Sequence, residues 1–134
     1  MAELERGQTF LDLKACNSDG TKGKFHISLS NVSFDDDILV CFVFNTEHKM
    51  SKYKLDCNPT SERFIIAPKT FSFITDFTSI MLHREVIYRL EEIYESNIKL
   101  LDIADDMLSR KIKNCICRDH ISPKMYALIT NSFK

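Results

Sequence analysis

The sequence has little glycine and no tryptophan. Its 134 residues include three Gly, three Pro and no Trp. Loops that cradle phosphates, such as Gly-x-Gly-x-x-Gly or the Walker loop, need glycines at fixed spacings, because only glycine lets the backbone come so close to a phosphate. Neither motif is present, and neither is His-Glu-x-x-His or Gly-x-Ser-x-Gly. These absences exclude the common nucleotide-binding loops and two common hydrolase motifs.

The chain also lacks an excess of charge of either sign. Lys and Arg number 18 against 19 for Asp and Glu, which leaves a net charge of −1. Proteins that coat nucleic acid non-specifically need many uncompensated cations, so that class is excluded. With 44% apolar residues the chain can bury a core. Its length suits a single domain over residues 1–134.

Long apolar segments are absent as well. The longest, residues 38–44, is far shorter than the roughly 20 residues that a membrane span needs. Residues 1–10 contain Glu3, Glu5 and Arg6 and do not resemble a secretory signal. The cysteines are odd in number, and Cys41 lies within the apolar segment, so we expect no oxidised framework. These features predict a protein of the reducing cytoplasm with no membrane partner.

Alternation of apolar and polar residues predicts strands in the first part of the chain. Residues 24–30 place Phe25 and Ile27 on one face and His26 and Ser28 on the other, which predicts a half-buried strand. Residues 38–44 are apolar throughout and predict a central strand that is covered on both faces. Turns are expected at residues 17–23 and 35–37. Further strands are expected at residues 10–15, 63–66, 70–74 and 79–82.

After His83 the apolar period changes from about 2 to about 3.6, which is typical of helices. We expect helices at residues 84–95 and 101–115, and a third that begins at Ser122-Pro123, where Ser caps the helix and Pro takes its first position. Strands followed by helices define an α+β class. The sequence therefore predicts a small, strongly curved antiparallel sheet or barrel over about residues 10–82, mainly β, followed by two or three C-terminal helices within residues 83–134, mainly α.

Several of these segments together resemble a known family. They are residues 24–30 (KFHISLS), the apolar strand that ends at Asn45-Thr46, the pair Phe64-Ile65, and residues 70–74 (TFSFI). This pattern, over about residues 22–82, resembles the PemK/MazF-like barrel proteins, which are toxins of toxin–antitoxin modules, and their relatives. The resemblance implies a small antiparallel barrel with a C-terminal helical part. It also implies metal-independent cleavage of single-stranded RNA without a cofactor, and a cognate antitoxin as partner.

The resemblance further implies which polar residues act on RNA. Cleavage needs one group to take the proton of the 2′-hydroxyl, one to protonate the leaving oxygen, and a cation that faces the phosphate. The matching positions are His26, Thr46 and either Thr70 or Ser72, since both of the last two fit the family's Ser-aromatic-aliphatic pattern. The nearby lysines do not match the family's basic positions, so a relative that binds RNA without cleaving it is the alternative.

Residues 48–54, which we name the basic loop, combine lysines with an aromatic residue. In an RNA-binding interpretation, Lys49, Lys52 and Lys54 contact phosphates while a base stacks on Tyr53. Lys69 is a further candidate cation, and Lys52 or Lys69 is expected to converge with the polar candidates on one concave face. Solvated lysines, or a patch that binds an acidic antitoxin, are the alternatives.

A thiol or metal enzyme is less favoured. Residues 115–120 offer Cys115, Cys117 and His120. A structural zinc site usually has a second ligand pair, which is missing here unless Cys57 or His83 joins. No cysteine lies at a helix start or in a glycine-rich turn that would make it reactive. We therefore expect no metal and no cofactor.

Two classes of function follow from the sequence. The first is a toxin-like RNA-binding protein or endoribonuclease of a toxin–antitoxin or phage-defence module, either active or inactive as a catalyst. The second is a non-catalytic module that binds a protein partner, either in the groove between the sheet and the helices or by forming a homodimer. A concave face that gathers the polar candidates would favour the first.

Overall fold

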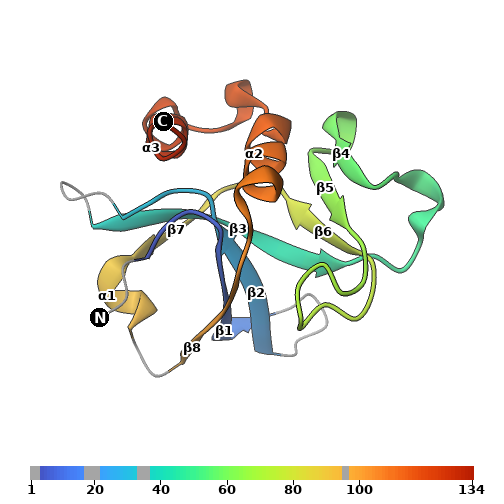
Figure 1. Ribbon diagram of the computed structural model, residues 1–134, viewed down its shortest axis with the longest axis horizontal. Helices are drawn as coiled ribbons and strands as arrows, with labels where there is room; N and C mark the ends of the chain where they lie inside the picture. Colours follow the sequence, from blue (N-terminus) through green and yellow to red (C-terminus); the bar gives the residue numbers. More distant parts are fainter. Residues whose placement is uncertain (1–3, 17–21, 33–36, 95–96) are drawn as a thin grey trace.

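The computed structural model describes residues 4–16, 22–32, 37–94 and 97–134 (Figure 1). Its strands are β1 (Gln8–Cys16), β2 (Lys22–Ser28), β3 (Ile38–Thr46), β4 (Asp56–Asn58), β5 (Arg63–Ile66), β6 (Thr78–Met81), β7 (Val86–Arg89) and β8 (Ile98–Ile103). Its helices are α1 (Leu90–Ile93), α2 (Asp106–Cys115) and α3 (Pro123–Asn131), with short 3-10 helices η1 (Met50–Lys52), η2 (Pro59–Ser61) and η3 (Arg118–His120). The turns predicted at residues 17–23 and 35–37 lie mostly outside the described residues.

β3 is the central strand of an antiparallel sheet of eight strands. The strand order is β4-β5-β6-β3-β2-β1-β8, and β7 pairs with β3 outside this order. Cys41 pairs with both Ser28 of β2 and Val86 of β7, so these two strands lie at opposite edges of β3. Beyond β7, the same edge pairs with β6, where Phe44 lies opposite Ile80. The α+β class is therefore confirmed, with an open sheet in place of a closed barrel.

The central strand is covered on both faces, as predicted. Val40 and Phe42 pack in a core cluster with residues of α2 and α3 such as Ile112. Leu39 and Cys41 point to the opposite face and pack in a second cluster with Phe10, Tyr88 and Ile93. Figure 1 shows α2 and α3 together on one side of the sheet and α1 on the other.

This second cluster corrects the prediction that β2 is half-buried. Ile27 and Leu29 are buried in the first cluster, as the alternation indicates. His26 and Ser28 are buried as well, with exposed fractions of 2% and 0%. Polar side chains normally mark a solvent face, but here the packing of β7 and α1 covers that face from a distant part of the chain.

The helix predicted at residues 84–95 is wrong over its first part. Val86–Arg89 is a strand, and only Leu90–Ile93 is helical. Val86, Ile87 and Tyr88 are β-branched or aromatic, which suits a pleated surface, and pairing with β3 outweighs the local helical period. The helix predicted at 101–115 likewise begins later, because Ile98–Ile103 pairs with β1 as strand β8.

The strand predicted at residues 70–74 is also wrong, because this segment folds as a series of turns. The Lys69 N–H donates to the Ile74 carbonyl over 2.8 Å, and the Ile74 N–H donates to the Phe71 carbonyl over 3.0 Å. Pro68 has no N–H to donate to a strand neighbour, and Lys69 adopts a left-handed φ of 69°. The strand at 63–66 is confirmed, and the one at 79–82 corresponds to β6.

Side-chain caps fix the starts of both long C-terminal helices. The Asp105 carboxylate accepts a hydrogen bond from the Leu108 N–H at the start of α2, over 2.8 Å. The Ser122 hydroxyl accepts from the Met125 N–H at the start of α3, and Pro123 takes the first helical position, as predicted. No helix in the described part of the chain is long and apolar enough to cross a membrane.

A disulfide joins Cys57 of β4 to Cys115 of α2, with their Cα atoms 5.5 Å apart. This corrects the expectation of a chain without an oxidised pair. An odd cysteine count says that one thiol stays unpaired, and it does not say that all do. The contact between β4 and α2 brings the two residues together, and their separation of 58 residues hides that contact in the sequence.

Candidate functional site

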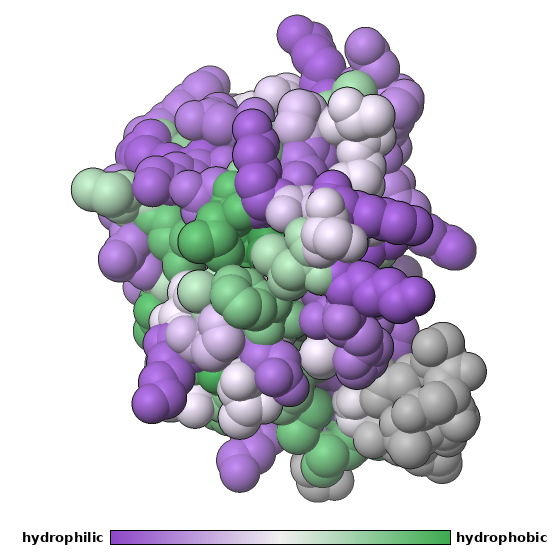
Figure 2. Space-filling model, turned by 90° about the vertical axis from the view of Figure 1, so that its right-hand side faces the viewer, coloured by the Kyte–Doolittle hydropathy of each residue, from purple (hydrophilic) through white to green (hydrophobic). Residues whose placement is uncertain are grey.

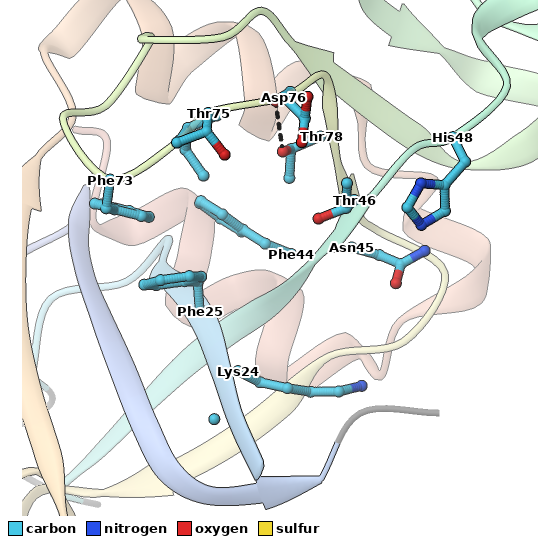
Figure 3. Close-up of a pocket in the computed structure, with 12 residues that line it drawn as sticks. Lys24, Phe25, Phe44, Asn45, Thr46, His48, Phe73, Thr75, Asp76 and Thr78 are labelled. Atoms are coloured by element: carbon cyan, nitrogen blue, oxygen red, sulfur yellow. Dashed lines mark hydrogen bonds between the residues drawn. The ribbon is translucent and has the colours of Figure 1, made fainter. Parts of the chain in front are cut away.

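A pocket of about 490 Å³ opens between the start of β2, the end of β3 and the segment that leads into β6 (Figure 3). Three phenylalanines, Phe25, Phe44 and Phe73, form one side of it. Its polar lining consists of Lys24, Asn45, Thr46, His48, Thr75, Asp76 and Thr78. The volume lies in the range typical of sites for small ligands.

The aromatic side of the pocket is a stack of rings. Phe25 and Phe73 lie with their ring centroids 4.5 Å apart and their planes at 24°. Phe44 lies 6.1 Å from Phe73 and the same distance from Phe71, between ring centroids. Phe44 and Phe71 are buried, whereas Phe25 and Phe73 are half-buried. The last two rings therefore present apolar surface to a molecule in the pocket.

The polar side of the pocket carries both signs of charge. Lys24 and His48 line it together with Asp76, whose backbone carbonyl accepts a 3.0 Å hydrogen bond from the Thr78 hydroxyl. Within the described residues, the side chains of Lys24 and His48 form no ion pair or hydrogen bond. Because the Lys24 ammonium has no such partner among the described residues, it can bind an anionic ligand without first breaking a contact.

Glu47 holds the end of β3 in place between Thr46 and His48. Its carboxylate accepts hydrogen bonds from Arg63 of β5 and from the Ser79 hydroxyl of β6. Its backbone N–H donates to the Phe77 carbonyl over 2.9 Å. These contacts tie the strand end to β5, β6 and the segment before β6. The neighbouring polar residues are thereby fixed at the pocket.

His26, the predicted catalytic histidine, lies outside this pocket in the second core cluster. Its ring stacks on Phe10 with centroids 5.1 Å apart and meets Tyr88 edge-on at 5.3 Å. Its Nδ1 lies 3.1 Å from the Lys24 carbonyl, which can only accept, so Nδ1 carries the proton. Burial lowers the pKa of His26 from 6.5 to about 4, so the imidazole is neutral at physiological pH.

Tyr88 and Asp12 complete a buried polar group around His26. The Tyr88 hydroxyl donates to Asp12 Oδ2 over 2.6 Å and lies 3.4 Å from His26 Nε2. Burial opposes ionisation of Asp12, but the hydrogen bonds from Tyr88 and from the Lys14 N–H outweigh it and lower the pKa of the carboxyl. Burial raises the pKa of Tyr88. The group links β1, β2 and β7.

The other predicted catalytic residues do not converge either. Thr46 is exposed and lines the pocket. The Thr70 hydroxyl donates to the Ala67 carbonyl over 2.7 Å. The Ser72 hydroxyl and N–H donate to the Asp102 carboxylate over 3.0 and 2.7 Å, and the N–H bond is the main cause of the lowered pKa of Asp102. Of the four candidates, only Thr46 lies at the pocket.

The predicted RNA-binding residues are split between the basic loop and a separate turn. Lys49, Lys52 and Lys54 are exposed in the loop that starts at His48. Tyr53 has one ring face covered by the Arg63 guanidinium, 4.9 Å from the ring centroid. Lys69 is exposed in the turn after β5. Figure 2 shows the side of the molecule that lies at the right of Figure 1, where the basic loop is found. On this side, apolar surface is bordered by hydrophilic side chains.

Thr46 is the one predicted site residue among the residues that line the pocket, and the others were missed. Four of the missed residues matter most for binding: Lys24, Phe25, Phe73 and His48. Each lies within two positions of a candidate, since Lys24 and Phe25 precede His26, Phe73 follows Ser72, and His48 follows Thr46 by two. The signal that could have found His48 is its place at the end of a buried strand, beside the basic loop. The phenylalanines gave no such signal, because an apolar residue in a strand predicts core.

The chain was compared with known protein families, curated proteins and solved structures, and none of them matches it.

Proposed function

We propose that this chain is a toxin-like protein of the PemK/MazF-like class that binds single-stranded RNA in the aromatic pocket. The observation that carries the proposal is the stacked pair Phe25–Phe73 beside the Lys24 ammonium and the His48 imidazole. Proteins that bind single strands stack bases on aromatic rings and contact the phosphates with cations. The pocket holds both kinds of group on neighbouring walls.

The charge of the molecule favours local binding over coating. With a net charge of −1, the attraction for RNA has to come from a small region. The basic loop continues from His48, at the pocket, to Lys54. A strand that places one base on the phenylalanines can extend its phosphates along this loop. A duplex keeps its bases stacked on each other, so the proposal favours single strands.

If cleavage accompanies binding, the proposal assigns proton transfer to His48 and not to His26. His26 is sealed in the core and neutral. His48 is exposed at the pocket, with Asp76 on another part of the same wall and Lys24 as the cation for the phosphate. Metal-independent cleavage requires groups of these three kinds.

The test is binding of a short fluorescent single-stranded RNA, measured by anisotropy, with product analysis on a gel. We expect Lys24→Gln to weaken binding roughly tenfold, since a charge-assisted hydrogen bond contributes about 1.5 kcal/mol. Lys99→Gln, an exposed lysine on β8, is the matched control and keeps wild-type affinity. Equal affinity of wild type and Lys24→Gln would contradict the proposed site. Loss of cleavage with retained binding in His48→Ala would assign the catalytic role.

The toxin class acts on cytoplasmic RNA and implies a cognate antitoxin, so the Cys57–Cys115 disulfide has to persist in a reducing compartment. An acidic antitoxin segment would bind the basic loop and compete with RNA for the same lysines. A competition measurement tests this: an antitoxin encoded by the neighbouring gene should displace RNA that is bound to the protein. The proposed function uses no metal or cofactor.

A second candidate function is a protein-interaction module that forms a homodimer. The observation that favours it is the set of exposed apolar side chains at and after β8, namely Leu100, Ile103 and Met107, which are 40%, 57% and 69% exposed. Among the described strands, β8 lies at the end of the strand order, so one of its edges is not paired with another strand. A strand from a second copy could pair with this edge. Sedimentation of the wild type and of Ile103→Lys tests it, since the charge would dissociate a dimer formed at this edge.

A further inference from the structure

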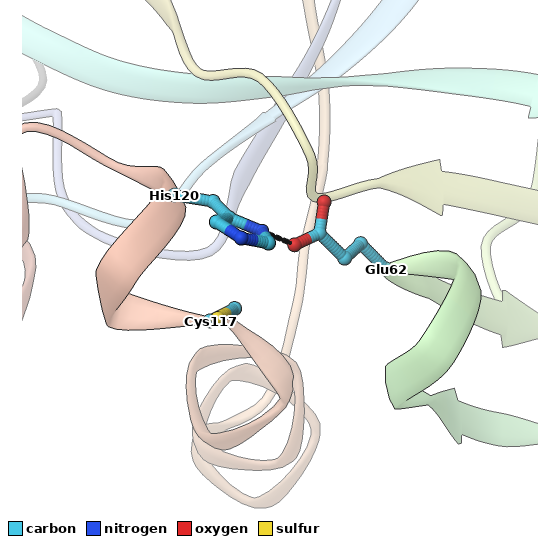
Figure 4. A group of neighbouring side chains, drawn as sticks. All are labelled: Glu62, Cys117 and His120. Carbon is cyan, nitrogen blue, oxygen red and sulfur yellow. Dashed lines mark hydrogen bonds and ion pairs between the residues drawn. The ribbon is translucent and has the colours of Figure 1, made fainter.

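Glu62, Cys117 and His120 bring three different metal-binding groups together, and none of the three lines the aromatic pocket. One carboxylate oxygen, the thiol sulfur and one imidazole nitrogen all lie within 4.8 Å of one another. Glu62 stands between η2 and β5, while Cys117 precedes η3 and His120 ends it. Figure 4 shows the imidazole and the carboxylate facing each other with Cys117 beside them.

The backbone around Glu62 sets the direction of its side chain. Its φ of 53° is in the left-handed region, which residues other than glycine rarely adopt. The Glu62 N–H donates to the Pro59 carbonyl over 3.2 Å, and its own carbonyl accepts from the Leu82 N–H over 2.8 Å. The residue is therefore held on both sides in a conformation that is disfavoured for glutamate, and its side chain is only 14% exposed.

The 3-10 helix η3 places the thiol and the imidazole on one side. Its i to i+3 geometry is closed by the His120 N–H, which donates to the Cys117 carbonyl over 3.0 Å. Because a 3-10 helix has three residues per turn, side chains at i and i+3 lie above one another. Ile116 and Ile121 flank the pair and are buried in the first core cluster. The turn is thereby fixed to the core while its two polar side chains face Glu62.

The donor set selects the metal by its chemistry. A thiolate and an imidazole are ligands of zinc and similar transition metals, whereas calcium and magnesium prefer oxygen alone. Ligand atoms of a tetrahedral zinc ion lie roughly 3.3 to 3.8 Å apart, given metal–ligand bonds of about 2.0 to 2.3 Å. The three atoms lie within 4.8 Å of one another, so small shifts of the side chains would bring them to these separations. In the structure His120 Nδ1 is hydrogen-bonded to the Glu62 carboxylate, and a bound cation would replace this hydrogen bond.

We propose that Glu62, Cys117 and His120 bind a zinc-class divalent ion, with the fourth coordination position open to water. His120 is 60% exposed, which leaves a solvent side for that water. Cys115 is not a ligand, because its sulfur is bonded to Cys57. The ion would tie the connection before α3 to the turn before β5. The proposal is independent of RNA binding in the aromatic pocket.

The experiment uses the full chain without a histidine tag. The protein is stripped with a chelator, dialysed against Zn²⁺, and analysed for bound metal per chain, and Co²⁺ is then used as a spectroscopic probe. We expect one ion per chain and a thiolate-to-cobalt absorption band, which only a cysteine ligand gives. Cys117→Ser abolishes the band, and both His120→Ala and Glu62→Gln weaken Zn²⁺ binding at least tenfold.

Matched variants separate an ion held by these three ligands from one held elsewhere on the chain. Asp119→Asn lies in η3 between the two ligands, is exposed and outside the cluster, and retains the ion. The double variant Cys57→Ser/Cys115→Ser removes the disulfide and also retains it. Circular dichroism confirms that each variant is folded. Absence of stoichiometric zinc in the folded wild type, an unchanged band in Cys117→Ser, or loss of the ion in either control would overturn the proposal.

Discussion

The ring of Phe25 in β2 stacks on the ring of Phe73 in the segment before β6, with the two centroids 4.5 Å apart. The two rings come from different segments of the chain, so the aromatic side of the pocket forms only where β2 packs against the segment before β6. Both rings stay half-buried, whereas Phe44 and Phe71 behind them are buried. A stacking surface that is supported from behind and open in front suits a flat ligand such as a base.

Replacement of Phe73 by alanine should weaken binding of single-stranded RNA. Stacking on an aromatic side chain contributes about 1 to 3 kcal/mol per base, so we expect a loss of roughly 5- to 150-fold in affinity. Phe77→Ala is the matched control, because Phe77 belongs to the same segment, is exposed and does not line the pocket. Anisotropy titration checks the prediction, and equal losses in the two variants would argue against stacking on Phe73.

The basic loop should determine the salt dependence of RNA binding. Each phosphate contact to a single strand contributes about 0.7 to the slope of log affinity against log salt. Replacing the three lysines of the loop with glutamine should therefore reduce that slope by about 2. The charge-matched control replaces Lys99, Lys111 and Lys113. A control slope as low as that of the loop variant would mean that only net charge matters.

The fold class could be predicted from the sequence because its strongest signals are local. The apolar segment at 38–44 needs cover on both faces wherever it lies, and the structure confirms this for β3. The Ser122-Pro123 start of α3 depends only on neighbouring residues. Residues 86–89 differ, because their local pattern favours a helix, whereas pairing with β3, which is far away in the sequence, favours a strand. The sequence pattern does not reveal that pairing.

The candidate site could be predicted only in part, for a related reason. Polarity marked His26 as a surface residue, since a histidine opposite apolar neighbours usually faces solvent. Tyr88 and Asp12 come from β7 and β1 and supply the buried polar contacts that make its burial tolerable. The basic loop was found because exposed charge depends little on long-range packing. The pocket wall depends on contacts between distant segments and could not be found in this way.

Reduction of the Cys57–Cys115 disulfide should destabilise the protein. The bond closes a loop of 58 residues, and a cross-link of that length restricts the unfolded chain by roughly 4 kcal/mol. Urea unfolding with and without a phosphine reductant measures the loss. The double variant Cys57→Ser/Cys115→Ser should unfold identically under both conditions. If the free energy of unfolding of the wild type is the same with and without the reductant, the bond does not form in solution.

The buried histidine should make stability fall between pH 6.5 and 4. The unfolded chain takes up a proton on His26 near its ordinary pKa of 6.5, whereas in the folded protein burial lowers that pKa to about 4. As the pH falls through this window, the unfolded state binds more protons and gains free energy relative to the folded state. The contribution is fully present above pH 6.5, and about 3 kcal/mol of it is lost by pH 4.

The variant that tests this is His26→Phe, which keeps a ring against Phe10 and removes the titrating group. It should lose about 3 kcal/mol less than the wild type when urea unfolding at pH 7 is compared with unfolding at pH 4. Its stability at pH 7 is itself lower, because the Lys24 carbonyl loses its donor. His83→Ala, at an exposed histidine, should retain the wild-type dependence. If His26→Phe shows that same dependence, His26 is protonated in the folded protein and the buried group is not closed to solvent.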